Sequence, residues 1–364
     1  MIVAGTRPEC IKLAPVIHEL RDRRSFAGIV VNSGQHPEAV RRTFAEFDVR
    51  CDVEVPPLLP SPNLAVASNR LIAALSQTIA QIEPWLVIVQ GDTLTAYAGA
   101  RAAARAECPV AHVEAGLRAP TPADPFPEEW FRRQIARHAD LHFAPCDSAY
   151  ANLVAEGVPA ERIHQTGNTG IDSLRGLLSQ HAIAPRTEVG RRVLVTLHRR
   201  ENWDGKADAI CNALVEICDR VPELTMLVPV HPNPRMAHRL RKQLSGDSRF
   251  SLVQPLAYRE FISAAASAAL VISDSGGIQE EVAHLGVPLI VPRSCTERPE
   301  CVETGFVRIV GAGHRDIVRE ALAMLALPRR APLPFDRGAP FGDGAAASRV
   351  VDVLESVLAD AAAA

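Results

Sequence analysis

The sequence predicts an α/β protein with two domains, each built around a parallel sheet. Short β-branched runs alternate with longer stretches in which apolar residues recur every three or four positions, as in βαβ units. A first series of these strands ends near residue 145, and a second series begins near residue 193. The chain has 364 residues, enough for two domains of about 100–200 residues each.

Each expected strand is a short apolar run that ends in polar or turn-forming residues. We predict strands at residues 2–3, 28–32, 86–90, 110–113, 141–144, 193–197, 225–230, 250–253, 270–273, 288–291 and 307–310. Helices are expected between them, for example at 71–83 and 209–220, and again at 345–358. Residues 170–191 form the expected connection between the two series, and the segment 327–344, rich in proline and glycine, is expected to be irregular.

The composition is that of a globular protein and excludes several classes of function. The 39 Lys and Arg residues face 42 Asp and Glu residues, and aromatic residues make up only 5% of the chain, so we expect no basic field or stacking surface for nucleic acid. No apolar run approaches the roughly 18–20 residues of a membrane span, and the N-terminus lacks the pattern of a signal peptide. We therefore expect a cytoplasmic protein without a nucleic-acid or membrane partner.

The chain contains 8 cysteines, none of them in a CxxC pair. This spacing argues against a structural zinc site or a thioredoxin-like site. In a reducing compartment we expect free thiols, most of them buried.

Polar segments directly follow many of the expected strands. They are Gly5-Thr-Arg-Pro-Glu, Ser33-Gly-Gln-His, Gly91-Asp-Thr and Glu114-Ala-Gly-Leu-Arg in the first series, and His198-Arg-Arg-Glu, His231-Pro-Asn and Asp274-Ser-Gly-Gly in the second. Ligands of parallel α/β sheets bind at the carboxyl ends of the strands. We interpret these segments as two binding edges that face a common cleft.

The segment that begins at Asp274 opens a helix and can bind an anion. Ser275, Gly276 and Gly277 leave backbone N–H groups free at the positive end of the helix dipole, where a diphosphate would fit. Glu281, one turn further on, could accept hydrogen bonds from ribose hydroxyls. The alternative is an ordinary N-cap made by the side chain of residue 274 or 275. The pattern is not GxGxxG, so no nicotinamide or flavin cofactor is expected.

Two cations lie near the start of the first expected helix, where they oppose the helix dipole. Arg7 and Lys12 are unfavourable there unless an anion is bound. The alternative is a solvated surface pair, which is the more natural interpretation of Lys12.

Three carboxylates are candidates for acid and base chemistry: Asp92 and Glu114 after strands, and Glu128 at a loop-to-helix start. The alternative for each is a structural role, and for Glu128 or its neighbour Glu129 a first-turn acid that stabilises its own helix. Arg118 and Arg132 lie nearby in the sequence and could pair with these carboxylates.

The histidine that leads His198-Arg-Arg-Glu is a further candidate, because two arginines follow it at a strand end. His112, His142 and His231 are weaker candidates, since a lone histidine is usually structural. No HxxxH or HExxH pattern exists, so we expect no metal site.

Taken together, these motifs resemble the non-hydrolysing UDP-N-acetylglucosamine 2-epimerases. The matching segments begin with Gly5-Thr-Arg-Pro-Glu-Cys-Ile-Lys-Leu-Ala-Pro, Ser33-Gly-Gln-His, Gly91-Asp-Thr, His112-Val-Glu-Ala-Gly-Leu-Arg, Pro127-Glu-Glu and Gly167-Asn-Thr. They continue with His198-Arg-Arg-Glu-Asn, Pro229-Val-His-Pro-Asn-Pro, Asp274-Ser-Gly-Gly-Ile-Gln-Glu-Glu, Thr296-Glu-Arg-Pro-Glu and Gly342-Asp-Gly. The segments occur in the family's order and cover nearly the whole chain.

The resemblance implies a glycosyltransferase-B-like fold of two Rossmann-like domains. The first would span 1–171 together with a helix at 345–364 that crosses back to it, and the second, which binds UDP, would span 172–344. The family inverts carbon 2 of UDP-GlcNAc to give UDP-ManNAc, without a cofactor, through loss of UDP and a 2-acetamidoglucal intermediate. It also implies a homodimer with a role in cell-surface polysaccharide biosynthesis.

The resemblance also implies roles for individual residues. The acid and base group would be Asp92, Glu114 and Glu128, and His198 would be the catalytic histidine. The substrate-binding residues would be Arg7, Lys12, Arg132, His231, Ser275, Gly276, Gly277, Glu281 and Arg298. Gln35, His36 and Arg70 resemble a part of the family that binds a second, allosteric UDP-GlcNAc.

The chain departs from the family at Phe131, where an asparagine is common. Either the ring reshapes the sugar pocket, which would favour a modified UDP-N-acetylhexosamine, or it packs inside its own helix layer. Three other functions remain open: a hydrolysing relative that releases ManNAc and UDP, a glycosyltransferase of the same fold, and a non-catalytic UDP-sugar sensor.

Overall fold

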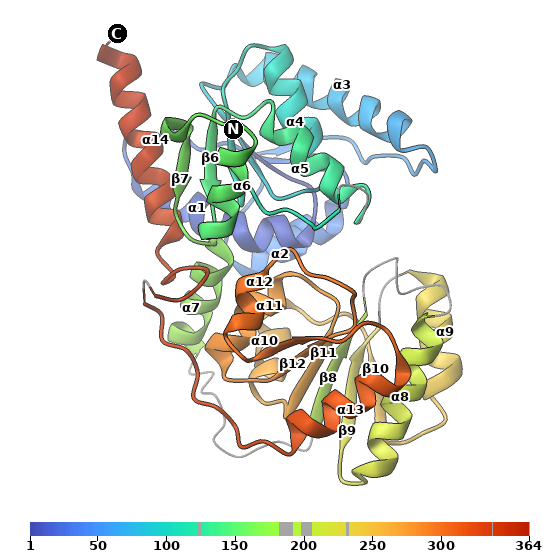
Figure 1. The fold of residues 1–364 in the computed structure, drawn as a ribbon. Coiled ribbons are helices and arrows are strands. Elements are labelled where there is room, and N and C mark those ends of the chain that lie inside the picture. The colour runs from blue at the N-terminus through green and yellow to red at the C-terminus, as the bar shows by residue number, and fades with distance from the viewer. Residues whose placement is uncertain (122–124, 182–191, 198–205, 231–232, 337, 364) are drawn as a thin grey trace. The chain divides into compact units, whose positions relative to one another are not determined.

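A computed structural model describes residues 1–121, 125–181, 192–197, 206–230, 233–336 and 338–363. The chain forms two compact units (Figure 1). The first unit consists of Met1–Gly176 with Phe335–Ala364, and the second of Leu177–Pro334. The prediction of two Rossmann-like α/β units with parallel sheets is confirmed.

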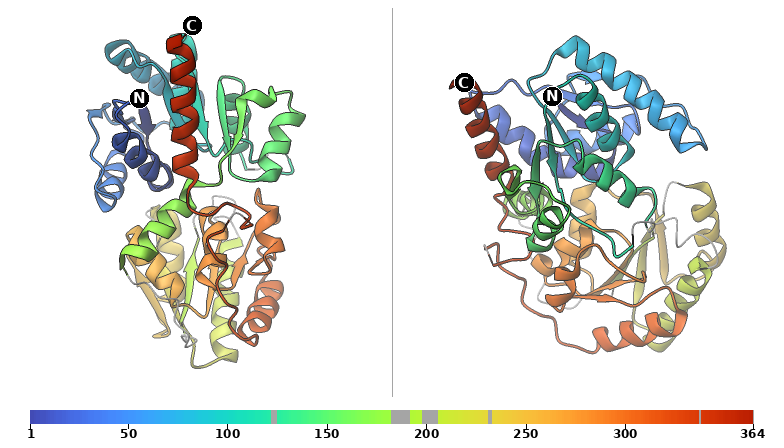
Figure 2. Two further views of the ribbon diagram at one scale, coloured as in Figure 1. Left: turned by 90° about the vertical axis from the view of Figure 1, so that its left-hand side faces the viewer. Right: turned by 45° about the horizontal axis from the view of Figure 1, so that its top comes forward.

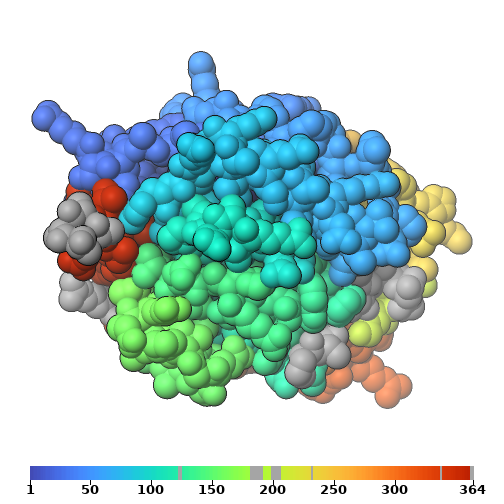
Figure 3. All heavy atoms as spheres, turned by 90° about the horizontal axis from the view of Figure 1, so that it is seen from above, coloured from blue at the N-terminus to red at the C-terminus, as the bar shows by residue number. Residues whose placement is uncertain are grey.

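The first unit is built on a seven-stranded parallel sheet with the strand order β3-β2-β1-β4-β5-β6-β7. The strands are β1 (Ile2–Ala4), β2 (Val30–Asn32), β3 (Val53–Glu54), β4 (Val87–Gln90), β5 (Val110–Val113), β6 (Leu141–Ala144) and β7 (Ile163–Gln165). The helices are α1 (Arg7–Asp22), α2 (Pro37–Glu46), α3 (Leu64–Ile82), α4 (Leu94–Arg105), α5 (Glu128–Ala136), α6 (Asp147–Ala155), the short η1 (Ala160–Arg162) and α14 (Ala346–Ala363), and α7 (Thr169–His181) begins in this unit. Helices α3 and α4 pack side by side on one face of the unit (Figure 3).

The second unit has a six-stranded parallel sheet with the order β10-β9-β8-β11-β12-β13. Its strands are β8 (Arg192–Thr196), β9 (Thr225–Pro229), β10 (Phe250–Val253), β11 (Leu270–Ser273), β12 (Leu289–Val291) and β13 (Val307–Ile309). Its helices are α8 (Lys206–Arg220), α9 (Pro234–Leu244), α10 (Tyr258–Ala266), α11 (Gly277–Leu285), α12 (Pro299–Glu303) and α13 (His314–Leu325).

The sequence prediction missed two strands, β3 and β7. Both are edge strands of the first sheet, and each contains exposed or half-exposed residues rather than a continuous apolar run. An edge strand pairs on one side only and can be short and polar. Such a strand carries little of the pattern on which strand prediction depends.

The C-terminal helix belongs to the first unit. Helix α14 lies beside α1 and buries Val350, Val351 and Leu354 in the same core as Ile17 (Figure 2). The carboxylate of Asp172, on α7, accepts hydrogen bonds from the backbone N–H groups of residues 346 (3.2 Å) and 347 (2.8 Å) at the start of α14. A carboxylate at this end complements the helix dipole and fixes the point where α14 begins.

All 8 cysteines are free, and only Cys51 and Cys295 are not fully buried. The prediction of free and mostly buried thiols is therefore confirmed. Burial also raises the pKa of the Cys51 thiol to about 11. In the described ranges, no helix combines the length and the apolar character needed to cross a membrane.

Candidate active site

Asp92 and Glu114 follow neighbouring strands, β4 and β5, at the same edge of the first sheet. The turn after β4 places Gly91 at a φ of +71°, and its N–H donates to the carbonyl of Val113 at 3.0 Å. Thr93, which follows Asp92, caps α4: its hydroxyl oxygen accepts a hydrogen bond from the N–H of residue 96 at 3.0 Å. The sheet therefore brings the two predicted carboxylates to one edge, as the sequence indicated.

Glu114 is held by several donors. The Nζ atom of Lys12 contacts both of its carboxylate oxygens at 2.6 Å. Gln90, the last residue of β4, also donates its side-chain N–H to Glu114, and Asn168 Nδ2 lies at 3.5 Å. Glu114 has a φ of +63°, a conformation that costs a non-glycine residue energy and is common at functional sites.

Lys12 is buried on α1, with a side chain that is 10% exposed. The interpretation of Lys12 as part of a solvated surface pair is wrong. Its ammonium lies against Glu114 because α1 follows β1, which is hydrogen-bonded to β4 in the sheet. Spacing along the sequence could not show this contact, since the two residues are 102 positions apart.

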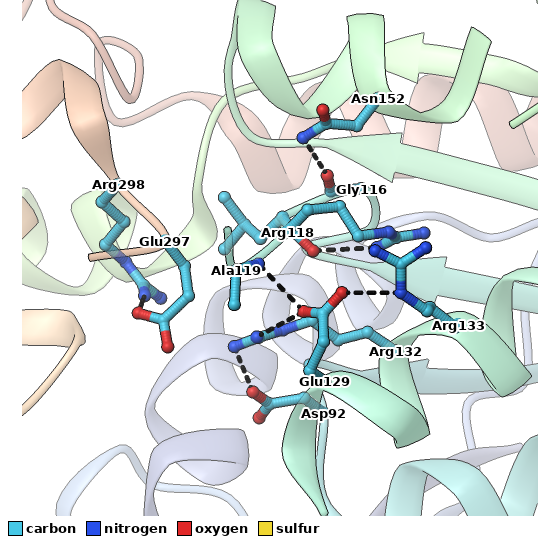
Figure 4. Close-up of polar contacts among 12 residues, drawn as sticks. Asp92, Gly116, Arg118, Ala119, Glu129, Arg132, Arg133, Asn152, Glu297 and Arg298 are labelled. Atoms are coloured by element: carbon cyan, nitrogen blue, oxygen red, sulfur yellow. Dashed lines mark hydrogen bonds and ion pairs between the residues drawn. The ribbon is translucent and has the colours of Figure 1, made fainter. Parts of the chain in front are cut away.

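Asp92 pairs with Arg132 from α5 (Figure 4). Arg132 is in turn bound by Glu129, whose carboxylate lies 3.3 Å from Arg132 Nη1. The prediction that Arg132 pairs with one of the carboxylates is confirmed. Arg118 forms a two-bond pair with Glu156 instead, at 2.8 and 2.7 Å.

Glu128 is the first residue of α5 and is partly exposed. Within the ranges that the structure describes, its carboxylate has no hydrogen-bond or ion-pair partner. Its neighbour Glu129 is fully buried. The two adjacent glutamates therefore differ in environment, with Glu128 open to a ligand and Glu129 enclosed by protein.

Phe131 packs inside the helix layer. Its side chain is 2% exposed, and its ring stacks on Tyr97 of α4, with the centroids 5.2 Å apart. Helices α4 and α5 enclose it in the core of the first unit. The structure supports the packing interpretation, and the substitution of Phe for Asn gives no reason to expect a modified sugar.

Glu9 is a buried residue that sequence reasoning missed. Its carboxylate accepts hydrogen bonds from the N–H of Gly5 at 2.9 Å and from the hydroxyl of Thr93 at 2.6 Å. It therefore joins the turn at Gly5, directly before α1, to the loop that carries Asp92. The Thr6-Arg-Pro-Glu9 pattern is that of a capping box, but Thr6 makes no side-chain cap.

Replacing Glu9 with Gln is expected to change how stability depends on pH. Burial raises the pKa of Glu9 from 4.5 to about 7. Protonated Glu9 therefore contributes to the free energy of unfolding of the wild type. This contribution is fully present below pH 4.5, and it is lost as pH rises through the folded-state pKa. The free energy of unfolding of Glu9→Gln should rise by about 3 kcal/mol relative to the wild type across this interval. Urea unfolding over this pH range measures the difference, and a constant difference between the two proteins would contradict it.

His112 supports the turn that precedes Asp92. Its Nε2 lies 2.8 Å from the carbonyl oxygen of Gly91, to which it must donate. Burial lowers the pKa of His112 to about 3 and that of His142 to about 4. At neutral pH both rings are therefore uncharged, and His112 has a structural role.

The second unit places the predicted anion site at the start of α11. Gly276 occupies the N-cap, and no side chain caps the helix. The interpretation of residue 274 or 275 as an ordinary cap is therefore wrong. A Cβ atom on Gly276 would lie 2.8 Å from Arg298 Nη1, so the guanidinium rests against this turn. Arg298 is buried and pairs with Glu280.

Glu281 lies one turn into α11 and is buried. Its carboxylate accepts a hydrogen bond from the hydroxyl of Tyr258, the first residue of α10, at 2.7 Å. In the segment before α12, Glu297 precedes Arg298, and its carboxylate accepts two hydrogen bonds of 3.0 Å from Arg293. Tyr258 carried no sequence signal, because an isolated tyrosine is not distinguishable from core packing.

The remaining predicted residues are placed as follows. Arg7 is the first residue of α1 and has no partner among the described residues. The side-chain carbonyl of Gln35 accepts hydrogen bonds from Thr95, at 3.0 Å from its N–H and 2.7 Å from its hydroxyl. His36 is the N-cap residue of α2, and Arg70 is exposed on α3. The predicted His198 and His231 lie outside the described residues.

Comparison with known proteins identifies the family. A family model described as UDP-N-acetylglucosamine 2-epimerase matches residues 18–355. The chain belongs to the UDP-N-acetylglucosamine 2-epimerase family. It is an epimerase, and the family indicated by the sequence motifs is confirmed.

Relatives of the epimerase match over nearly their full length. A probable UDP-N-acetylglucosamine 2-epimerase from Ralstonia solanacearum is 36% identical, with 99% of each chain covered. The epimerase of Bacillus subtilis is 34% identical, with 97% of this chain and 94% of the relative covered.

Solved structures of epimerases match as well. The Neisseria meningitidis epimerase bound to UDP-GlcNAc has a TM-score of 0.91 at 32% identity and covers 98% of this chain and 99% of its own. The Methanocaldococcus jannaschii epimerase in complex with UDP-GlcNAc and UDP has a TM-score of 0.86 at 30% identity, covering 98% and 99%.

Proposed function

We propose that the protein interconverts UDP-GlcNAc and UDP-ManNAc by eliminating UDP and adding it back. The bond between carbon 1 and the UDP oxygen breaks, and the proton on carbon 2 leaves, which gives 2-acetamidoglucal and UDP. Return of a proton to the opposite face of carbon 2, with re-addition of UDP, completes the inversion. The proton of carbon 2 is not adjacent to a carbonyl, so cleavage of the anomeric bond must make it acidic.

The observation that carries this proposal is the pair of strand-end carboxylates at one edge of the first sheet. Glu114 is fixed by Lys12 and Asp92 by Arg132, so each carboxylate is held in place before substrate binds. Glu128, which is partly exposed and has no partner among the described residues, supplies a third carboxylate. Preorganised carboxylates can stabilise an oxocarbenium-like sugar and transfer protons at its two faces.

UDP is expected to bind at the start of α11. The uncapped N-terminus offers the backbone N–H groups of Gly276 and Gly277 to a diphosphate, whereas the N–H of Ser275 donates to Ser273 Oγ at 3.1 Å. The guanidinium of Arg298, which pairs with Glu280, lies beside Gly276. Glu281, oriented by Tyr258, can accept hydrogen bonds from the ribose. His198 and His231 are proposed contacts on the basis of the motif resemblance alone.

Incubation with UDP-GlcNAc in deuterated water, followed by NMR, tests the reaction. The proposal predicts UDP-ManNAc and deuterium at carbon 2 of both UDP-sugars. Free ManNAc with UDP would show a hydrolysing enzyme instead. No exchange and no product from an intact protein would overturn the elimination mechanism.

UDP alone is expected to stabilise the protein, because it occupies the anion site without needing the sugar. At a concentration 100 times the dissociation constant, a ligand of the folded state adds about 2.7 kcal/mol. A thermal-shift series with UDP, and with uridine as a control that lacks phosphates, measures this effect. An unchanged melting temperature at saturating UDP would contradict the nucleotide site.

We propose allosteric activation by a second UDP-GlcNAc near Gln35, His36 and Arg70. Gln35 binds Thr95 in the first turn of α4, so the segment contacts the helix that follows the loop of Asp92. Initial rates that rise sigmoidally with UDP-GlcNAc in the wild type, and hyperbolically in Arg70→Ala, would support this proposal.

We also propose a cytoplasmic homodimer. Over its 19 residues α3 carries Arg70 as its single charged side chain, and it exposes Ala65, Val66, Ala73 and Ala80 beside the polar Asn69, Gln77 and Gln81. An exposed helix face with small apolar side chains and only one charge is suited to association with a second copy. Light scattering of the wild type and of Val66→Glu measures the mass; a wild-type monomer would contradict the dimer.

A further inference from the structure

Two adjacent glutamates begin α5, but only one is open to a ligand. Glu129 is fully buried, and burial of a carboxylate is costly unless charged or hydrogen-bonding groups surround it. Its oxygens lie 3.0 Å from the N–H of Ala119, 3.3 Å from Arg132 Nη1 and 2.9 Å from Arg133 Nε. Figure 4 shows these three donors converging on the Glu129 carboxylate.

Two of these donors connect Glu129 to Asp92 and to the loop of Glu114. Arg132 binds Glu129 and Asp92 at once, so Glu129 fixes the guanidinium that holds Asp92. Ala119 lies in the loop that begins at Glu114, and its N–H is tied to the same carboxylate. One buried side chain is thus connected to the loop of Glu114 and to the partner of Asp92.

The ion-pair network continues from Arg133 to Glu156 and from there to Arg118 in the Glu114 loop. Arg133 also pairs with Glu156 at 3.1 Å, and Glu156 binds Arg118 through two contacts. Arg118 precedes Ala119 in the loop that begins at Glu114, so Glu156 also contacts this loop, but within the described chain it touches neither Arg132 nor Ala119. This difference gives a matched control within one network.

We infer that Glu129 is a positioning residue of the epimerase reaction. It holds the carboxylate of Asp92 in place through Arg132, and it holds the Glu114 loop in place through the N–H of Ala119. Glu129 does not need to touch substrate. Its carboxylate must be charged and of full length, because two guanidinium groups and an amide meet on its two oxygens. A glutamine keeps the shape of the side chain but loses the charge and one acceptor. The inference rests on the proposed proton transfers at carbon 2.

The experiment compares Glu129→Gln with Glu156→Gln in the full-length protein. Wild-type exchange of deuterium at carbon 2 is measured first, because its absence would count against the proposed function rather than against Glu129. We then expect Glu129→Gln to lower kcat by about 10²-fold, the usual effect of a misplacement of about 1 Å. The dissociation constant of UDP should stay within about twofold of the wild type, because the proposed UDP site lies in the other unit.

Glu156→Gln is expected to keep kcat within about threefold, since the contacts of Glu129 with Arg132 and with the N–H of Ala119 stay in place. Glu129→Asp, which keeps the charge with a shorter reach, should recover part of the lost kcat. If Glu129→Gln does not fold, Glu129→Asp alone must show the fall in kcat with unchanged UDP binding. Wild-type kcat in a folded Glu129→Gln protein, or equal losses in Glu129→Gln and Glu156→Gln, would overturn the inference.

Discussion

Replacing Asp92 with Asn is expected to lower kcat by about 10²–10⁴-fold, the usual contribution of an acid or base group. Asp92 lies at the carboxyl end of β4, where Arg132 holds its carboxylate in place. Asparagine keeps the size and the hydrogen-bonding shape, but it can neither accept a proton nor stabilise positive charge on the sugar. The loss should therefore appear in kcat more than in the affinity for UDP.

Glu114→Gln and Glu128→Gln are expected to show losses on the same scale. Steady-state rates with UDP-GlcNAc, together with deuterium exchange at carbon 2, separate loss of proton transfer from loss of UDP release. Exposed Glu38→Gln on α2 is a control that should leave kcat unchanged. Near-wild-type turnover in folded Glu128→Gln would remove Glu128 from the mechanism, although Asp92 and Glu114 could still act.

Replacing Lys12 with Met is expected to lower the free energy of unfolding by about 3–5 kcal/mol. The side chains of Lys12 and Glu114 are 10% and 6% exposed. Removal of the ammonium takes the Lys12 charge away from a buried carboxylate, although Gln90 and Asn168 still donate to it. Urea unfolding of the variant and the wild type measures the loss, which should be accompanied by loss of activity.

A double substitution tests the same pair. Lys12→Met with Glu114→Gln removes both charges, so it should recover much of the stability that Lys12→Met alone loses. Arg41→Met breaks exposed ion pairs with Glu38 and Glu54, and it should change stability little, because such pairs are screened by solvent. Strictly additive losses in the double variant would contradict a direct buried pair.

The order of strands and helices was predictable because it depends on local patterning. Strands β5, β6, β10 and β11 begin and end at the predicted residues. The sequence also offered an uncapped start of α11, because consecutive glycines after a strand leave backbone N–H groups available, but only the structure decided against a side-chain cap. The missed strands β3 and β7 lie at sheet edges, where one-sided pairing requires little apolar pattern.

The sequence by itself determined the fold class, the family and the types of residue available for chemistry. It also indicated that Asp92 and Glu114 share a sheet edge, since both follow strands of one parallel sheet. These properties depend on periodicity and motif order, which a linear chain records directly. Motif order could not show the environment of a side chain.

Only the tertiary structure decided which of these residues are paired, buried or open. It placed Lys12 on Glu114, 102 positions away, and it distinguished buried Glu129 from open Glu128 one position earlier. It also showed that Phe131 packs against Tyr97. Charge pairing and burial depend on distances across the sheet and between helices, and chain folding sets those distances without leaving a local pattern in the sequence.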